Sequence, residues 1–558
     1  MAFLLCVVLV LSFVACKEDD TSSDIQSATQ STTQSNTQSS TQSETQSTTQ
    51  SGTVSSESTG SKSEMTETVD INKGKIDITS DLKETVKRDD DGEVKAPVNP
   101  AGLSTNYVGG AEREANAMRN KILNTGNTEE YYTITGTKYY VSPGGNDENS
   151  GTSPQEAIRT IDGVNTLKLK AGDAVLFERG AVFRQTQAVR TIDGVIYGSY
   201  GKGEKPKLLA SPMNFAEAKW QPSERKNIWK TMYIYDEAGS MVFEHGEEIG
   251  YLKTSVRNLT ANTQFYFNES DGYMYLYCDK GNPSDVYESI EVGTKVPNFN
   301  IPARTGAIID NICAKYSSWI GIKGHFNCTD VVVTNCEIGF VGGYLYGVVR
   351  AGNAIQCWQG VQERFVVQNC WIYQTFDTAV SWQGSGGEGY KYMNIVFDSN
   401  LTEYNNCDYE HWDHGATLGD FQITNNMMRF TALGWGTRID DGGVRGIEGV
   451  FYADTSDMLH VGKVIVKNNV IDCPDRKVFD WEINGEDYKG NVVWDTWDKY
   501  YEISGTRVYW KQAYRNSTEI VRGTQRVETD GSVRGTTKEV IEEGLKRFDP
   551  TLKFTWIE

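Results

Sequence analysis

Short runs of β-branched and aromatic residues recur along the second half of the chain. Each run ends in Asn or Ser and is followed by another apolar pair. A segment this short cannot bury its inward Val and Ile side chains alone, so the copies must stack at about 4.8 Å per rung. The spacing of the copies indicates a coil of about 22 residues with loops inserted at a fixed place. The copies begin at residues 308, 332, 366, 395, 421, 464 and 488.

This repeat predicts a parallel β-helix, because the Leu scaffold of leucine-rich repeats and the 3.6-residue period of α-helical repeats are both absent. Asn tolerates a left-handed bend, and its amide can hydrogen-bond to the next rung. Cys336 and Cys370 occupy one repeat position, so we expect them to stack in the core. The sequence leaves open whether they form a disulfide or remain buried free thiols.

The first hundred residues have a different pattern. Residues 2–15 form an apolar run of signal-peptide length, too short to span a bilayer. Residues 21–63 are rich in Ser, Thr and Gln, with a four-residue repeat, and cannot bury apolar area. We expect a disordered tether there, followed by one short amphipathic helix over residues 111–124.

The end of the apolar run, Phe13-Val14-Ala15-Cys16, resembles the lipobox of bacterial lipoproteins. That resemblance implies a diacylated Cys16 and an extracellular protein held at the membrane by its lipid anchor alone.

Residues 138–180 resemble the first coil of secreted right-handed parallel β-helix proteins of the pectate-lyase-like superfamily, many of which act on polysaccharides. Four segments carry the resemblance: residues 138–147, 151–154, 158–161 and 171–180. It implies an all-β fold, a right-handed parallel β-helix (solenoid) with short capping helices. Long alternating runs over residues 211–300 add a small antiparallel β insertion.

These patterns divide the chain into six parts. They are a lipoprotein signal peptide (1–16), a disordered linker (17–105), an N-terminal cap with the first coils (106–210), the β insertion (211–300), the coils with the candidate active face (301–500) and a C-terminal extension (501–558).

The net charge of the chain limits the classes of molecule that it could bind. With 54 basic and 75 acidic residues the formal net charge is −21. No stretch concentrates Lys and Arg, so we expect no nucleic-acid partner. An anionic polysaccharide is disfavoured unless a cation bridges it to the protein. We expect a monomer whose partner is a polysaccharide or oligosaccharide.

Counting from the bend residues aligns candidate side chains on successive coils. Trp382, Trp412 and Arg438 each follow their own bend residue by thirteen positions. Matching offsets predict one longitudinal face. Carboxylates there could act as acid and base, and aromatic rings could stack on sugars. The predicted catalytic residues are Asp377, Glu410, Arg438, Asp413 and His411, with Asp408 as a substitute carboxylate; the predicted substrate-binding residues are Trp382, Trp412, Trp435, Asn353 and His414.

A second resemblance covers residues 350–438, which are similar to recurring blocks in uncharacterised β-helix proteins of gut and rumen Firmicutes. It singles out Asp377, Glu410 and Arg438 but implies no particular substrate. Each candidate also has a structural interpretation, as a turn former, an ion-pair partner or a packed aromatic side chain. Asp440 and Asp441 could bind Ca²⁺ or lie in a solvated turn, so the expected cofactor is none or Ca²⁺.

Three functions fit the sequence. A glycoside hydrolase would use Asp377 and Glu410 as its carboxylate pair. A polysaccharide lyase of the pectate or alginate type would need a Lys, Arg or His base, for which Arg438, His411 and His414 are candidates, and a cation or an Arg to neutralise a uronate carboxylate. A non-catalytic glycan-binding protein or adhesin would use the aromatic face alone.

Overall fold

The computed structural model describes residues 112–303, 305–346, 349–384, 389–412, 416–437, 449–455, 459–460 and 462–472, and beyond these only short strands. The described residues all belong to one compact unit, residues 71–558. The predicted signal peptide, the anchor Cys16 and the linker up to residue 105 lie outside the described residues.

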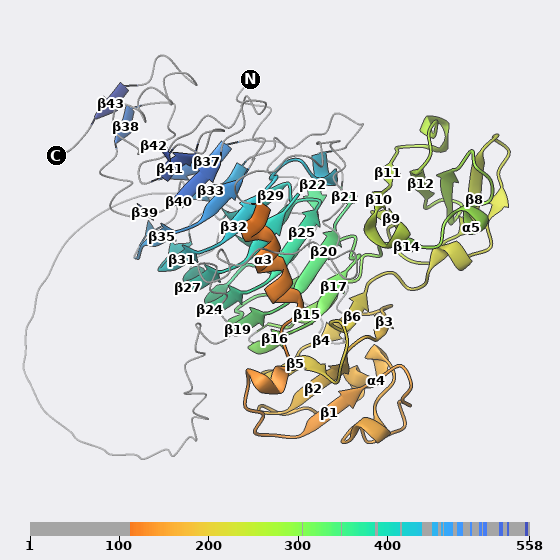
Figure 1. Ribbon diagram of the computed structural model, residues 1–558, viewed down its shortest axis with the longest axis horizontal. Coiled ribbons are helices and arrows are strands. Elements are labelled where there is room, and N and C mark those ends of the chain that lie inside the picture. Colours follow the sequence, from red (N-terminus) through yellow and green to blue (C-terminus); the bar gives the residue numbers. More distant parts are fainter. Residues whose placement is uncertain are drawn as a thin grey trace, which may run out of the picture. The chain divides into compact units, whose positions relative to one another are not determined.

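Three long sheets form the body of the protein, and strand neighbours within each are parallel except at the β41–β42 pair (Figure 1). Sheet A contains β1 (Lys138–Val141), β2 (Ala174–Glu178), β5 (Val195–Tyr200), β16 (Ala307–Asp310), β19 (Thr329–Thr334), β24 (Val361–Gln368), β27 (Lys391–Asp398), β30 (Thr417–Leu418), β31 (Phe421–Thr424), β34 (Leu459–His460), β35 (Val464–Lys467) and β39 (Tyr501–Ser504). Sheet B contains β3 (Val182–Arg184), β6 (Lys207–Leu209), β17 (Cys313–Lys315), β20 (Glu337–Val341), β25 (Trp371–Thr375), β28 (Leu401–Glu403), β32 (Met427–Arg429), β36 (Val470–Asp472), β40 (Thr506–Tyr509), β41 (Thr524–Val527) and β42 (Val533–Arg534). Sheet C contains β4 (Val189–Arg190), β15 (Phe299–Ile301), β18 (Ile322–His325), β23 (Ile355–Trp358), β26 (Thr378–Gln383), β29 (Cys407–Trp412), β33 (Gly449–Thr455) and β37 (Lys477–Ile483).

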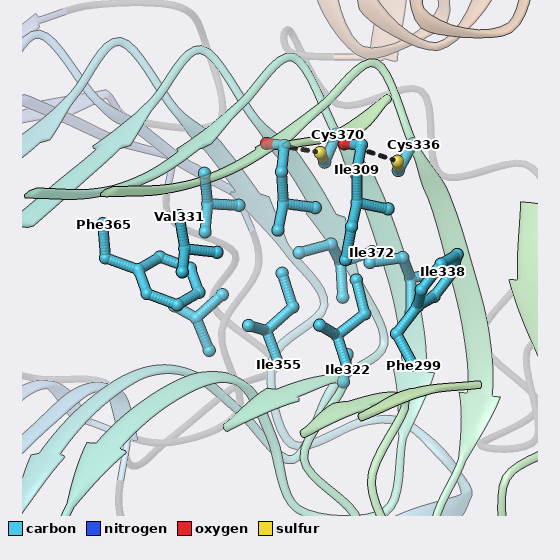
Figure 2. Close-up of a cluster of buried hydrophobic side chains, with 14 of the residues drawn as sticks. Phe299, Ile309, Ile322, Val331, Cys336, Ile338, Ile355, Phe365, Cys370 and Ile372 are labelled. Atoms are coloured by element: carbon cyan, nitrogen blue, oxygen red, sulfur yellow. Dashed lines mark hydrogen bonds between the residues drawn. The ribbon is translucent and has the colours of Figure 1, made fainter. Parts of the chain in front are cut away.

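The chain visits the sheets in a fixed order, A then B then C, once per coil. Thus β24, β25 and β26 form one coil, and β27, β28 and β29 form the next. Alternate side chains of all three sheets point inward and form one continuous apolar core, part of which Figure 2 shows. This arrangement confirms the predicted parallel β-helix and its period, which inward-facing Val, Ile and Phe stabilise by stacking rung on rung.

The bend from sheet A to sheet B contains the predicted left-handed residue. Its side chain is Asn in most coils and Ser in one, because a short polar residue tolerates a positive φ. The φ angles are 62° at Asn311, 53° at Asn335, 51° at Asn369, 57° at Ser399, 57° at Asn425 and 56° at Asn468.

From the bend at Asn335 onward, the residue after the bend takes part in a hydrogen-bonded ladder inside the coil. Asn400 donates through Nδ2 to Val367 O at 2.9 Å, and its Oδ1 accepts from the backbone N–H of Cys370. Asn400 Nδ2 also donates to Asn426 Oδ1, and Asn426 Nδ2 to Asn469 Oδ1, both at 3.0 Å. The amides therefore join successive coils through the core.

Cys336 and Cys370 extend this ladder toward the first coils. The Cys370 thiol donates to Val333 O at 3.5 Å and the Cys336 thiol to Ile309 O at 3.6 Å (Figure 2). Both thiols are buried and free, so of the two forms that the sequence leaves open the structure has the unoxidised one. The thiol S–H of Cys thus takes the place of the amide N–H donor of Asn, but Cys has no carbonyl oxygen to accept a hydrogen bond as Asn does.

Helix α3 (Glu112–Leu123) covers the outer face of sheet B, as the sequence predicts for a short amphipathic helix (Figure 1). Its Ala115, Met118 and Ile122 pack against a cluster that includes Leu401 and Met427. A cluster of buried, paired charged side chains lies beneath the helix. Arg119 Nη2 lies 2.6 Å from Glu403 Oε2, Arg429 Nη1 lies 2.8 Å from Glu403 Oε1, and Arg429 Nε lies 2.9 Å from Asp472 Oδ2.

Burial by itself raises the pKa of Glu403, but the guanidinium groups of Arg119 and Arg429 outweigh it and lower the pKa below its ordinary value. Sheet B is therefore closed by a helix and by paired charges, and is not the open face of the β-helix.

The predicted insertion is antiparallel except at one strand pair, in which residues 251–252 run parallel to residues 264–265, and it has its own core. Strands β7 (Gln221–Pro222), β8 (Ile228–Met232), β13 (Tyr273–Tyr277), β12 (Gln264–Asn268) and β11 (Tyr251–Leu252) form one sheet, and β10 (Glu248–Ile249), β9 (Met241–Phe243) and β14 (Ile290–Val292) form a second. Residues such as Phe265, Met274 and Leu276 fill the space between them and α5 (Pro283–Val286). The remaining described elements are α4 (Ile161–Thr166), β21 (Tyr344–Tyr346), β22 (Val349–Ala351), β38 (Asn491–Val493), β43 (Lys553–Thr555) and the 3₁₀ turns η1 (Thr128–Glu130), η2 (Pro154–Glu156), η3 (Phe215–Glu217), η4 (Glu244–Gly246), η5 (Val256–Asn258) and η6 (Trp435–Thr437).

Candidate functional site

The outer face of sheet C carries Glu410 and Trp412, two of the side chains that the sequence predicts on an active face. Ile322, Ile355, Val380 and Tyr409 lie side by side on successive strands and point into the core. The residues that follow them therefore point outward. This outward column runs Lys323, Gln356, Ser381, Glu410 and Tyr452.

Glu410 lies in the middle of this column and accepts several hydrogen bonds on one oxygen. Ser381 Oγ donates to Glu410 Oε2 at 2.5 Å, and Gln383 Nε2 donates to the same oxygen at 2.9 Å. Thr378 Oγ1 lies 3.5 Å from it. Gln383 Nε2 also donates to Ser381 Oγ at 2.6 Å, which leaves the Ser381 proton for Glu410. Donors that converge on a carboxylate favour its ionised form.

Sequence reasoning selected Glu410 but missed Ser381 and Gln383. The signal was present in β26, where Ser381 lies between the apolar Val380 and Trp382 and so must face the other side of the strand. Its partner across the rung could not be read from the sequence, because that pairing depends on the length of the preceding bend.

Trp382 and His411 do not lie on the outer face. The two residues are neighbours in register, and both are buried, with Trp382 1% exposed and His411 fully enclosed. The Trp382 ring packs 6.0 Å from Phe365 and 5.3 Å from Tyr409. The prediction that Trp382 stacks on a sugar and that His411 acts in catalysis is therefore wrong, because both side chains fill the core.

The structural reason is a bend one residue shorter in the coil that contains Glu410. Gln374 and Tyr404 are the left-handed residues that end sheet B in successive coils. Thr378, four residues after Gln374, pairs with Cys407, only three residues after Tyr404. A shift of one residue reverses the face on which every later side chain lies. Residues at equal distances from their bend residues, such as Trp382 and Trp412, therefore lie on opposite faces of sheet C.

Asp377 lies at the bend between sheets B and C, where two longer connections meet. Arg350 Nη2 donates to the backbone carbonyls of Phe376 and Gly436, and its guanidinium lies 4.2 Å from the centre of the Phe376 ring. Trp435 packs on the same ring at 4.8 Å. Asp377 follows Phe376 directly and is 4% exposed, so the packed contacts of Phe376 fix the position of its backbone.

Of the other predicted binding residues, two are buried and hold the protein's own structure, and one faces outward. Trp435 is buried and donates through Nε1 to Gln374 O at 2.8 Å, so its predicted sugar stacking is not available in this arrangement. Asn353 is also buried, and its Oδ1 accepts the backbone N–H of Thr378 at 2.9 Å, a bond that fixes the bend rather than a ligand. Trp412 faces outward and is half-buried, so it keeps its predicted role as a candidate for stacking.

Asp408, the substitute carboxylate, lies inside the bend rather than on the face. Burial raises the pKa of Asp408 to about 6, and hydrogen bonds from Thr431 and Asn405 oppose that rise. It supports the bend from within. Arg438, Asp413, His414, Asp440 and Asp441 lie outside the described residues, and their predicted roles remain predictions.

Within the described segments no group of three or more His, Cys, Asp and Glu side chains could hold a metal ion. Among the same segments, none of the helices has the length and apolar character needed to cross a membrane.

No family model matches the chain, and no curated protein matches it. Solved structures with a similar course include XylC in complex with xylose (TM-score 0.38, 12% identity, 72% of this chain and 73% of that chain). A GH136 lacto-N-biosidase from Eubacterium ramulus has a TM-score of 0.39 at 15% identity over 72% of this chain and 68% of its own. A rhamnogalacturonan lyase has a TM-score of 0.37 at 12% identity over 72% of this chain and 90% of its own. Likeness of this degree does not define a function.

Proposed function

We propose that the protein is a carbohydrate-active enzyme, a glycoside hydrolase that cleaves an extracellular polysaccharide on the outer face of sheet C. The observation that carries the proposal is the convergence of Ser381 and Gln383 on Glu410 Oε2. A buried carboxylate that accepts these donors on one oxygen, on the same strand as the outward and half-buried Trp412, is suited to act as a base or a nucleophile.

A hydrolase needs a second carboxyl group as its acid. Asp377 is the first candidate, and strand geometry limits what it can do. Ser381, the rung neighbour of Glu410, follows Asp377 by four residues, so the Cα atoms of Asp377 and Glu410 are on the order of 14 Å apart. Retaining enzymes need carboxyl groups about 5–5.5 Å apart and inverting enzymes about 6.5–9.5 Å. Of the two outcomes, Asp377 fits inversion.

Asp454 is the competing acid, since it pairs with Trp412 on the next strand, two residues beyond the position of Glu410. Arg438 would hold a hydroxyl or carboxylate of the substrate, and Asp413 and His414 would lie beyond the end of β29. Attachment through Cys16 at the cell surface completes the proposal, with the substrate outside the cell.

A lyase is the second candidate because of one observation, the presence of Lys323 in the same outward column as Glu410. A lysine can neutralise a uronate carboxylate or accept a proton during β-elimination. The hydrolase and the lyase differ in their products, because only elimination leaves an unsaturated sugar that absorbs ultraviolet light.

The test is a screen of the purified mature chain against plant and microbial glycans, with reducing-end and ultraviolet readouts in parallel. We expect new reducing ends without ultraviolet absorbance. Glu410→Gln should abolish turnover, whereas Asp330→Asn, a surface carboxylate of sheet A paired with Arg364, should leave it unchanged. Comparing Asp377→Asn with Asp454→Asn identifies the acid.

Two results would contradict the hydrolase. Ultraviolet-absorbing products would assign the lyase instead. Glycan binding by the wild type without any turnover would make the protein a binding protein or adhesin.

A further inference from the structure

Two buried thiols meet inside the coils at the start of sheet C. Cys357 lies on β23 and points into the core, and Cys328 lies in the bend between β18 and β19. A methyl group placed on Gly324, the rung neighbour of Cys357, would lie 2.7 Å from Cys357 Sγ and 3.0 Å from Cys328 Sγ. The two sulfur atoms are therefore within about 6 Å of each other and point into the same space.

The missing side chain at Gly324 has the same cause. On other rungs of sheet C the equivalent inward positions hold the larger residues Ile301, Trp382 and His411. Gly324 differs from them because the two sulfur atoms occupy the volume that a side chain would need. The two thiols are therefore part of the core packing at this rung.

The two thiols are also hydrogen-bonded to each other. Cys357 donates to Cys328, and this bond lowers the pKa of the Cys328 thiol although burial opposes it. Cys328 Sγ also has a long contact, 3.7 Å, with His325 O. Burial raises the pKa of the Cys357 thiol. Because the thiolate is the reactive form of cysteine, Cys328 is the better placed of the two to attack another sulfur.

Cys336 and Cys370 form a second pair of buried thiols, but their geometry differs. They occupy the same position on neighbouring coils, so their Cβ atoms are about 4.8 Å apart, whereas a disulfide spans about 3.5–4.5 Å. Burial and a hydrogen bond with Cys370 also raise the pKa of the Cys336 thiol. Cys328 and Cys357 come from a bend and a strand, so the spacing of the rungs does not hold their side chains apart.

We propose that Cys328 and Cys357 are the site of a disulfide bond that forms when the protein folds in an oxidising environment. The bond would close the loop from residue 328 to residue 357, which contains β19 and β20, and would thus cross-link one coil to the next. Such a bond stabilises a protein mainly by restricting the unfolded chain. The inference depends neither on the proposed carbohydrate activity nor on the proposed export, although export would supply the oxidising environment.

The oxidant is an external disulfide, such as glutathione disulfide. The Cys328 thiolate attacks one of its sulfur atoms, so that a mixed disulfide forms and one thiolate leaves. Cys357, after loss of its proton, then attacks the Cys328 sulfur and releases the second thiolate. The two protein thiols lose two electrons and two protons, and the external disulfide becomes two thiols. Because both cysteines are buried in the folded protein, the exchange takes place during folding, before the next coil covers them.

The test refolds the mature chain from denaturant with glutathione and glutathione disulfide, and in parallel with a reducing agent. Free thiols are alkylated in denaturant, and the peptides are identified by mass spectrometry without reduction. We expect the oxidised sample to contain Cys328 and Cys357 in one cross-linked peptide pair, with Cys336 and Cys370 alkylated. The Tm of the oxidised sample should be about 3 °C or more above that of the reduced sample.

Cys357→Ala removes one partner and should abolish this difference in Tm, leaving Cys328 alkylated. Cys370→Ala is the matched control, because Cys370 is a buried cysteine of the same core, and it should keep the difference. Should Cys357→Ala fail to fold, the peptide map of the wild type decides by itself.

Two results would overturn the disulfide. One is the recovery of Cys328 and Cys357 from the oxidised wild type as alkylated thiols or bridged to other cysteines. The other is a difference in Tm between oxidised and reduced samples that is as large in Cys357→Ala as in the wild type.

Discussion

Ser381 and Glu410 face each other across one rung of sheet C, with Oγ and Oε2 2.5 Å apart. The direction of this bond follows from Gln383, whose amide nitrogen donates to Ser381 Oγ and leaves the serine proton for the carboxylate. Ser381 is thus a positioning residue that also favours the charged form of Glu410.

Replacing Ser381 tests this role. Ser381→Ala removes a donor to a charged group, worth about 1.5–3 kcal/mol, so kcat/KM should fall about tenfold or more on the glycan that the screen identifies. Without the donor the pKa of Glu410 should rise, and the acidic limb of the pH–rate profile should move to higher pH. Ser381→Thr keeps the hydroxyl and should restore the profile. An unshifted profile in Ser381→Ala would show that the serine is merely structural.

The two tryptophans of neighbouring coils should respond in opposite ways. Trp382→Ala empties a core position and should cost about 3–5 kcal/mol of stability, visible as a lower Tm. Trp412→Ala removes a half-buried outward ring and should cost only about 1 kcal/mol while weakening glycan binding. Thermal unfolding and binding, measured on both variants, check this. A large loss of stability in Trp412→Ala would show that its ring packs against the protein instead.

Asp408 makes stability depend on pH. Its pKa is about 6 in the folded protein and about 3.8 unfolded, so between these values the folded state binds more protons. Stability should therefore fall as pH rises from about 4 to about 6, by up to about 3 kcal/mol. Asp408→Asn keeps the acceptor for Asn405 and should flatten this part of the curve. Unfolding midpoints measured at pH 4, 5, 6 and 7 test it. Parallel curves for the two proteins would exclude Asp408 as the source.

The internal ladder can be extended by one amide. In Cys370→Asn the new amide should donate to Val333 O, as Asn400 donates to Val367 O one coil later, and should leave stability unchanged or raise it by about 1 kcal/mol. The reverse change, Asn400→Cys, loses the amide acceptor of the Cys370 backbone and should cost about 1–3 kcal/mol. Tm values of the two variants provide the measurement. Equal losses in both would mean that steric fit, and not hydrogen bonding, governs this position.

The repeat is enough to predict the architecture, because a coil that buries its inward Val and Ile only by stacking leaves few alternatives. The bends at Asn335, Asn369 and Asn425, the helix before the first coil and the antiparallel insertion follow from local chemistry, and all are present. The candidate site was predicted less well. Glu410 and Trp412 point outward from sheet C as expected, although Glu410 is itself only 2% exposed. Trp382 and His411 point into the core instead, and Trp435 packs against Phe376.

The sequence by itself determined that the chain winds into a β-helix, because hydrophobic periodicity and bend residues act over a few neighbouring positions. Only the tertiary structure decided which side chains share a face. The pairing of Thr378 with Cys407 depends on a bend one residue shorter, and that difference puts Trp382 opposite His411 and Ser381 opposite Glu410. Counting from the bends cannot detect such a slip, since the slip changes the facing of every later residue without changing the pattern of apolar and polar positions.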